Sequence, residues 1–215
     1  MVDKKYYFLL IIFICSLNFI KVSSYNMPLK DKVIYLDPGH GGVDSGAIYK
    51  DILEKNINLD FCYLLKSKLE NKGAKVFMTR YDDYDLALPN VSLRKRSDLE
   101  NRAQVINESN SDLYLSIHLN STTSSKWNGL QIFYDDINKE NKLLAESLKE
   151  SIGSKRNVTE ISTKYMYKRI NIPGVLIELG FLSNYQDRTN LLNDKYLDTL
   201  ANKIVDGVCV HLDNK

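Results

Sequence analysis

Short runs of β-branched and aromatic residues alternate with segments of helical periodicity along this chain, and that alternation limits the folds it can adopt. The pattern predicts strands at 32–36, 75–79, 112–117, 130–134 and 175–179, and helices at 54–71, 93–107, 141–152 and 196–212. The strand runs are apolar almost throughout, which is typical of parallel strands covered on both faces. We therefore expect an α/β fold, a single domain whose mostly parallel, mixed and twisted sheet is flanked by helices on both faces.

Length and charge narrow the functional classes. The 215 residues suffice for one domain with a sizeable core. The formal net charge is only +2, and without Asp3, Lys4, Lys5 and Lys21 the numbers of basic and acidic residues are equal. A chain that binds nucleic acid needs an excess of cations to neutralise phosphates, so we expect no nucleic-acid partner.

The N-terminus has the parts of an export signal. Lys4 and Lys5 precede an uncharged apolar run over 6–20, and small residues follow it. A helix over this run is about 22 Å long, which is shorter than the hydrocarbon core of a membrane. We expect residues 1–24 to be a signal peptide or a signal anchor, with a catalytic domain over 25–215. The chain is then exported, and it touches the membrane only through the N-terminal segment.

The cysteines and the last histidine carry weaker signals. Cys62 and Cys209 lie within apolar helical patterns, so we expect two small buried thiols, with a disulfide between them left open. Neither has a neighbouring cysteine or histidine at metal-binding spacing. His211 is expected at the protein surface.

Two histidines follow predicted strands. His40 lies in a glycine-rich turn after the first strand, and His118 lies just past the strand at 112–117. Open α/β sheets place their sites at these carboxyl ends. Glu54 begins the next helix and can reach the same edge. Two histidines and one glutamate form a catalytic zinc set with a fourth position open. Each residue also has a structural interpretation, as a turn histidine, a core histidine and a helix-capping charge.

Glu178 is a candidate for acid–base chemistry. It is an isolated charge within an apolar run near the end of a predicted buried strand. Burying a carboxylate without a partner is costly, so such a residue has a metal, a cation or a catalytic task as its reason. Hydrolysis of an amide needs a group that takes a proton from water and returns it to the leaving nitrogen. A salt bridge is the alternative explanation for Glu178.

Several motifs resemble one enzyme family. They are VIYLDPGHGGVDSGA (33–47), VFMTR (76–80), SLRKRSDLENRAQVIN (92–107), DLYLSIHLNS (112–121) and IPGVLIELGFLSN (172–184). Together they resemble the zinc-dependent N-acetylmuramoyl-L-alanine amidases of bacterial cell walls, over nearly the whole exported part of the chain. The resemblance implies His40, Glu54 and His118 as ligands of a Zn²⁺ cofactor and Glu178 as the catalytic glutamate. It also implies peptidoglycan as substrate, cleaved between the lactyl group of N-acetylmuramic acid and L-alanine.

The compact architecture, one N-terminal segment and a bare catalytic domain, resembles the sporulation-associated members of this family. That resemblance implies synthesis of muramic-δ-lactam in spore cortex together with a peptidoglycan deacetylase, a role in germination, and a location in the cell wall or forespore intermembrane space. An accessory activator protein is a further possible partner. A general autolysin, a zinc peptidase of the stem peptide and a non-catalytic peptidoglycan-binding module remain alternatives.

Overall fold

The computed structural model describes residues 27–161 and 165–213, so the apolar run over 6–20 and the expected signal segment 1–24 lie outside the described residues. A six-stranded sheet runs through the domain in the order β4-β1-β5-β8-β6-β7. The first four of these are parallel, β6 is antiparallel to β8, and β7 is parallel to β6. In sheet order the strands are Lys75–Met78, Val33–Pro38, Leu113–Asn120, Gly174–Phe181, Gln131–Tyr134 and Thr159–Glu160.

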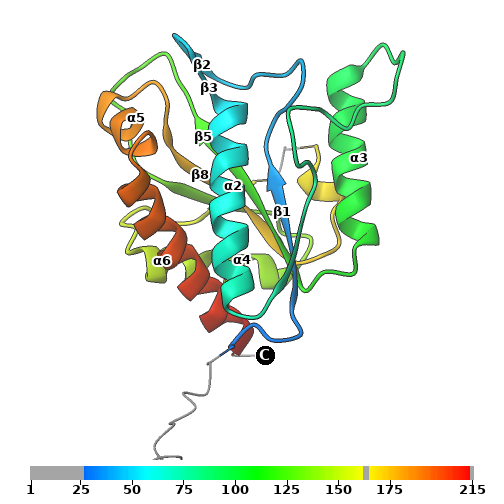
Figure 1. Cartoon of the computed structure of the whole chain (residues 1–215), viewed down its shortest axis with the longest axis vertical. Helices are drawn as coiled ribbons and strands as arrows, with labels where there is room; N and C mark the ends of the chain where they lie inside the picture. The colour runs from blue at the N-terminus through cyan, green and yellow to red at the C-terminus, as the bar shows by residue number, and fades with distance from the viewer. Residues whose placement is uncertain (1–26, 162–164, 214–215) are drawn as a thin grey trace, which may run out of the picture.

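Helices cover both faces of the sheet, but unequally (Figure 1). One face packs against α2 (Glu54–Asn71), α4 (Lys139–Ile152) and α6 (Asp194–Asp213). The other face packs against α3 (Arg94–Glu108) and the 3-10 turn η1 (Tyr167–Arg169). The expected α/β fold, a mostly parallel mixed sheet with helices on both faces, is thereby confirmed.

Helix α2 illustrates why the predicted helices form. Its apolar side chains Ile57, Phe61, Leu65 and Leu69 recur at helical spacing and are buried against the sheet. Burial of each stabilises the fold by about 1.5–3 kcal/mol relative to an exposed side chain. The chain turns away at Gly73, whose φ of 100° is a conformation that glycine adopts without strain.

The sparse cover on the α3 face leaves room for a site. Side chains of β5 and β8 point alternately to the two faces. Leu115, Ile117 and Ile177 enter the core beneath α2 and its neighbours, whereas Tyr114 and Leu176 pack on the α3 side. Among the described residues α3 is the one long helix on that side (Figure 1). The last residues of the strands there line a pocket.

Several short elements were not predicted. A hairpin of β2 (Ile48–Tyr49) and β3 (Ile52–Leu53) stands before α2, and a seven-residue helix, α5 (Tyr185–Leu191), follows β8. With β7, these elements are too short for apolar periodicity to mark them. The prediction that His118 follows its strand is also wrong, because β5 continues through it to Asn120.

The surface position expected for His211 is wrong. The residue is 6% exposed, and its Nε2 lies 4.0 Å from Glu140 Oε2 of α4. His211 lies three residues after Val208, about one helical turn, so it shares the buried face of α6. This face packs on α4. Cys62 is buried and Cys209 half-buried, and both are free thiols. Burial raises the pKa of both thiols.

Within 27–161 and 165–213, no helix combines the length and the apolar character needed to cross a membrane.

Candidate active site

His40 is held in a strained turn directly after β1. Its φ is 61°, a left-handed conformation that side chains other than glycine rarely adopt. Gly39 allows a close approach, since a Cβ there would lie 2.2 Å from the His118 ring. The two imidazole rings consequently meet edge to face, with centroids 4.9 Å apart. The turn therefore brings both histidines to one place, as the sequence predicted.

Glu54 links the two histidines. It is the first residue of α2, where the helix dipole favours a carboxylate. Its Oε1 lies 3.1 Å from His40 Nε2 and 3.1 Å from His118 Nδ1, and it accepts a hydrogen bond of 2.9 Å from the Leu119 backbone N–H. Its Oε2 accepts one of 2.8 Å from the Ala47 N–H. Two backbone N–H groups and two imidazole nitrogens thus surround a carboxylate that is 3% exposed and fix its orientation.

These contacts also shift the protonation equilibria. Burial alone would raise the pKa of Glu54, but the hydrogen bonds and charges of His118 and His40 outweigh burial and hold it far below the usual range. Burial opposes a charged His40, yet Glu54 and Asp44 together raise the pKa of that imidazole. Glu54 is therefore ionised at neutral pH, the form in which a carboxylate binds a metal.

The cluster has the donor set of a metal site. One ligand atom from each of His40, Glu54 and His118 lies within 4.8 Å of the others. Ligands at about 2.0–2.2 Å from a tetrahedral zinc ion lie roughly 3–3.5 Å apart, which agrees with the 3.1 Å contacts of Glu54. The second ring nitrogen of His40, Nδ1, lies 3.0 Å from Asp44 Oδ2. A carboxylate on the far nitrogen of a ligating histidine is a common feature of zinc sites.

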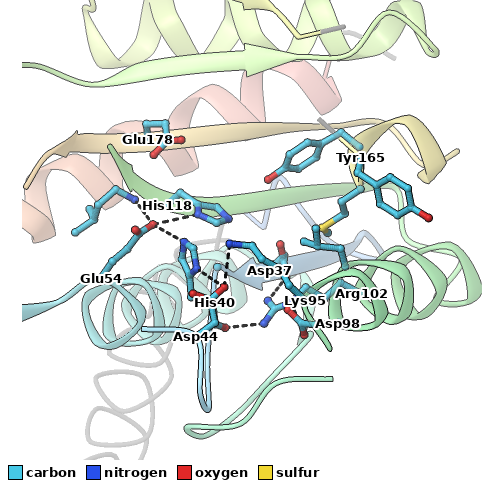
Figure 2. Close-up of a pocket in the computed structure, with 15 residues that line it drawn as sticks. Asp37, His40, Asp44, Glu54, Lys95, Asp98, Arg102, His118, Tyr165 and Glu178 are labelled. Carbon is cyan, nitrogen blue, oxygen red and sulfur yellow. Dashed lines mark hydrogen bonds and ion pairs between the residues drawn. The ribbon is translucent and has the colours of Figure 1, made fainter. Parts of the chain in front are cut away.

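Glu178 lies beside this cluster (Figure 2). It is the residue of β8 that pairs in register with His118 of β5. Registered residues of neighbouring strands project to the same face, so both side chains reach the pocket. Glu178 is 7% exposed and lines the pocket together with the three clustered residues. The structure therefore brings together all four residues that the sequence singled out.

A buried polar network supports the His40 turn from below. Arg102 of α3 donates to Asp37 Oδ1 at 2.8 Å and to the carbonyls of Pro38 and His40 at 2.8 and 2.6 Å. Arg80 donates to the carbonyls of Pro38 and Gly39, each at 3.0 Å. Burial acts against ionisation of Asp37, but Arg102, Ser116, His118 and Thr79 outweigh it and lower the pKa of that carboxyl.

Sequence reasoning missed the second layer of the site. Asp37, Asp44 and Arg102 stand inside the quoted motifs, but no role was given to them. The signal available for Arg102 was a cation on the same helical face as Leu99 and Ile106, because a charge among core positions needs a buried partner. That partner, Asp37, is 65 residues away and could not be identified from spacing.

The pocket is a cleft of about 340 Å³ between the strand ends and α3. The clustered residues and Glu178 line one part of it, and Lys95, Leu99, Tyr165 and Met166 line another. Such a cleft, with a candidate metal site and a buried carboxylate, has the components for hydrolysis of an amide.

Comparison with known proteins identifies the family. A family model described as N-acetylmuramoyl-L-alanine amidase matches residues 34–210. A curated relative, the germination-specific N-acetylmuramoyl-L-alanine amidase of Bacillus subtilis, is 38% identical over 219 residues, covering 97% of this chain and 92% of the relative. The chain belongs to the N-acetylmuramoyl-L-alanine amidase family. This amidase also matches LytC of B. subtilis at 34% identity, over 84% of this chain and 35% of LytC.

Solved amidase structures share the fold. The CwlD amidase of Clostridioides difficile, determined in complex with the GerS lipoprotein, superposes with a TM-score of 0.81 at 36% identity, covering 86% of this chain and 100% of that one. The catalytic domain of CwlV from Bacillus (Paenibacillus) polymyxa superposes with a TM-score of 0.74 at 29% identity, covering 86% and 99%. The chain is thus an enzyme that hydrolyses the N-acetylmuramoyl-L-alanine amide of peptidoglycan.

Proposed function

We propose that this amidase is zinc-dependent, with His40, Glu54 and His118 as the zinc ligands and Glu178 as the general base and acid. The 3.1 Å contacts of Glu54 Oε1 with both imidazoles carry the proposal, because they gather two imidazole nitrogens and one ionised carboxylate at a single point. Bound zinc supplies a Lewis acid that polarises the scissile carbonyl.

The protein's own residues then perform four tasks. Asp44 accepts the Nδ1 proton of His40, which leaves Nε2 as the free donor atom toward the metal. The Leu119 and Ala47 N–H groups fix the rotamer of Glu54. Arg102 holds the carbonyl of His40 and so keeps the turn in place. Glu178 accepts a proton from the attacking water at its carboxylate and donates it to the departing alanine nitrogen.

We further propose that the enzyme acts in spore cortex, in the synthesis of muramic-δ-lactam with a peptidoglycan deacetylase. The support is the germination-specific relative, which this chain matches over nearly the full length of both proteins. Because the C. difficile CwlD amidase was solved in complex with a lipoprotein, a lipoprotein is also the proposed class of accessory partner.

The N-terminal segment is proposed to determine where the enzyme acts. Residues 1–24 are proposed to export the chain as a signal peptide or anchor, with the catalytic domain over 25–215 outside the cytoplasm. The target of the enzyme, peptidoglycan, lies on that side of the membrane.

Mass spectrometry of digested peptidoglycan tests the activity and the role of Glu178 together. Purified spore and vegetative peptidoglycan are incubated with the zinc-loaded chain, with Glu178→Gln, and with Glu150→Gln, an exposed glutamate of α4 that serves as the matched control. We expect release of intact stem peptides beginning with L-alanine by the wild type and by Glu150→Gln. Glu178→Gln should retain stoichiometric zinc and lose at least a hundredfold in rate.

Other products would identify the alternatives. Shortened stems still attached to muramic acid mean a peptidase, and binding without any release means a peptidoglycan-binding module. Equal cleavage of both peptidoglycans means a general autolysin. A Glu178→Gln variant that lacks zinc would contradict the division of roles between the ligands and the base.

A further inference from the structure

The catalytic pocket holds two cationic side chains besides its histidines, among the residues that the structure describes as lining it. They are Arg102 and Lys95, and their surroundings differ. Arg102 is fully buried, and it is committed to Asp37, Asp98 and two backbone carbonyls. Its task is to hold the floor of the pocket. Lys95 of α3 also lines the pocket, and its side chain is mostly exposed (Figure 2).

Lys95 is only loosely held. Its side chain is 70% exposed, and its Nζ lies 3.4 Å from Asp44 Oδ2. That same oxygen is 3.0 Å from His40 Nδ1, so Asp44 already has a closer partner. The neighbours of Lys95 on α3 are paired more closely: Arg94 donates to Asp85 at 2.8 and 2.9 Å, and Arg96 to Glu100 at 3.1 Å. An exposed pair at 3.4 Å contributes little to stability.

The position of Lys95 is also unfavourable for its own helix. Lys95 is the second residue of α3, whose first turn holds no acidic side chain. Cations near a helix N-terminus face the positive end of the dipole and lose a few tenths of a kcal/mol. Neither helix stability nor its ion pair therefore accounts for a lysine here, and of the three cations in this turn Lys95 is the one that lines the catalytic pocket.

The charges of the pocket show what Lys95 can recognise. Besides the histidines, Arg102 and two tyrosines, the ionisable side chains that line the pocket with Lys95 are carboxylates, namely Asp37, Asp44, Glu54, Asp98 and Glu178. Arg102 pairs with Asp37 and Asp98, so Asp44 and Glu178 remain as carboxylates that repel an anionic substrate group. The glycan side of the scissile amide presents hydroxyl and acetamido groups, whereas the peptide side carries free carboxylates. A mostly exposed lysine in the lining of an acidic pocket thus complements the peptide side of the substrate.

We propose that the Lys95 ammonium leaves Asp44 and binds a free carboxylate of the substrate's peptide, which makes Lys95 a specificity residue for the peptide moiety. This rests on the proposed amidase mechanism only in taking the muropeptide as substrate. No covalent step is involved. Binding of the carboxylate directs the peptide end of the substrate toward α3.

The test pairs a lysine variant with a substrate variant. Full-length zinc-loaded wild type, Lys95→Gln and a matched control, Lys142→Gln on the exposed side of α4, are purified in mild detergent. Each is assayed on N-acetylmuramoyl-L-Ala-D-Glu and on its diamide, in which no carboxylate remains. Zinc content and melting temperature are recorded for every variant, so that a folding defect is recognised.

We expect Lys95→Gln to lower kcat/KM on the free acid about three- to tenfold, through KM. On the diamide, Lys95→Gln and the wild type should agree within about twofold, and Lys142→Gln should match the wild type on both compounds. An equal loss on acid and diamide, or no loss on the acid, overturns the proposal.

Failure of the amidase assignment is distinguishable from failure of this inference. If the wild type cleaves neither compound, ligand-observed NMR still measures the Kd of the free acid and of the diamide. A Kd for the acid that rises in Lys95→Gln, with the Kd of the diamide unchanged, supports the role of Lys95. Equal Kd values for the acid in both proteins overturn it.

Discussion

Replacement of Arg102 by methionine tests whether the buried network beneath the His40 turn holds the domain together. The guanidinium is 2% exposed and faces Asp37, which is 1% exposed. Removing one partner of a buried ion pair costs about 3–5 kcal/mol, because the other charge stays buried without compensation. In a domain of this size, that loss lowers the melting temperature by about 9–15 °C.

The assay is urea denaturation of the metal-free chain, followed by circular dichroism. Arg102→Met should shift the midpoint and leave the slope unchanged. Adding Asp37→Asn should recover part of the lost free energy of unfolding at pH 7, because it removes the carboxylate that Arg102→Met leaves buried without a cation. The matched control is Arg96→Met, an exposed ion pair on the same helix, which should leave the free energy of unfolding nearly unchanged.

The pKa of Asp37 determines how the free energy of unfolding changes with pH. In the wild type the pKa of Asp37 is lowered, so its contribution to stability is present above its unfolded pKa and is lost as the pH falls through the folded value. Without Arg102, Asp37 loses the largest of the effects that oppose burial, so its folded pKa should rise and protonation should remove the cost of the buried charge. The difference in the free energy of unfolding between the wild type and Arg102→Met should therefore become smaller as the pH falls toward 4. A loss below about 1 kcal/mol at pH 7, or no recovery by Asp37→Asn, refutes the reasoning.

Two further outcomes concern the metal cluster. Chelation should lower the melting temperature by about 10 °C, because a metal present at 1,000 times its Kd stabilises the fold by about 4 kcal/mol. Calorimetry with EDTA and with restored zinc measures the shift. Equal unfolding curves in the two conditions would contradict a metal site. Gly39→Ala should weaken zinc binding at least tenfold in a competition titration with a chromophoric chelator, because its Cβ would lie 2.2 Å from the His118 ring; unchanged affinity would mean that the ring does not need this close approach.

The main helices and strands could be predicted from the sequence because their apolar patterns and their start and stop residues agree with the fold. The prediction for residues 54–71 matches α2, where apolar period and a stop at Gly73 coincide. His211 shows the limit. A lone histidine near the C-terminus predicts a surface residue, although its helical spacing from Val208 places it on the apolar face of the helix. The burial comes from α4, which packs across α6 and is far away in sequence.

Some residues of the site could be predicted from the sequence and others could not. His40 and His118 follow predicted strands, Glu54 begins a predicted helix and Glu178 lies near the end of a predicted strand, so the rule that parallel strands end at one edge was enough to bring them together. The pairs of Asp44 with Lys95 and of Asp37 with Arg102 depend on how α3 crosses the sheet. A helix that packs one turn farther along would break both pairs, and no spacing in the sequence fixes that register.

The orientation of α2 determines how the domain presents its pocket. The described chain enters at the far end of this helix, where the Leu29 N–H donates to the Lys72 carbonyl, whereas Glu54 begins the helix at the pocket. Eighteen helical residues separate the two ends by about 27 Å. If residues 1–24 anchor the chain as proposed, the attachment joins the domain at the end of α2 opposite the pocket. The length of this helix then separates the point of attachment from the residues that contact the substrate.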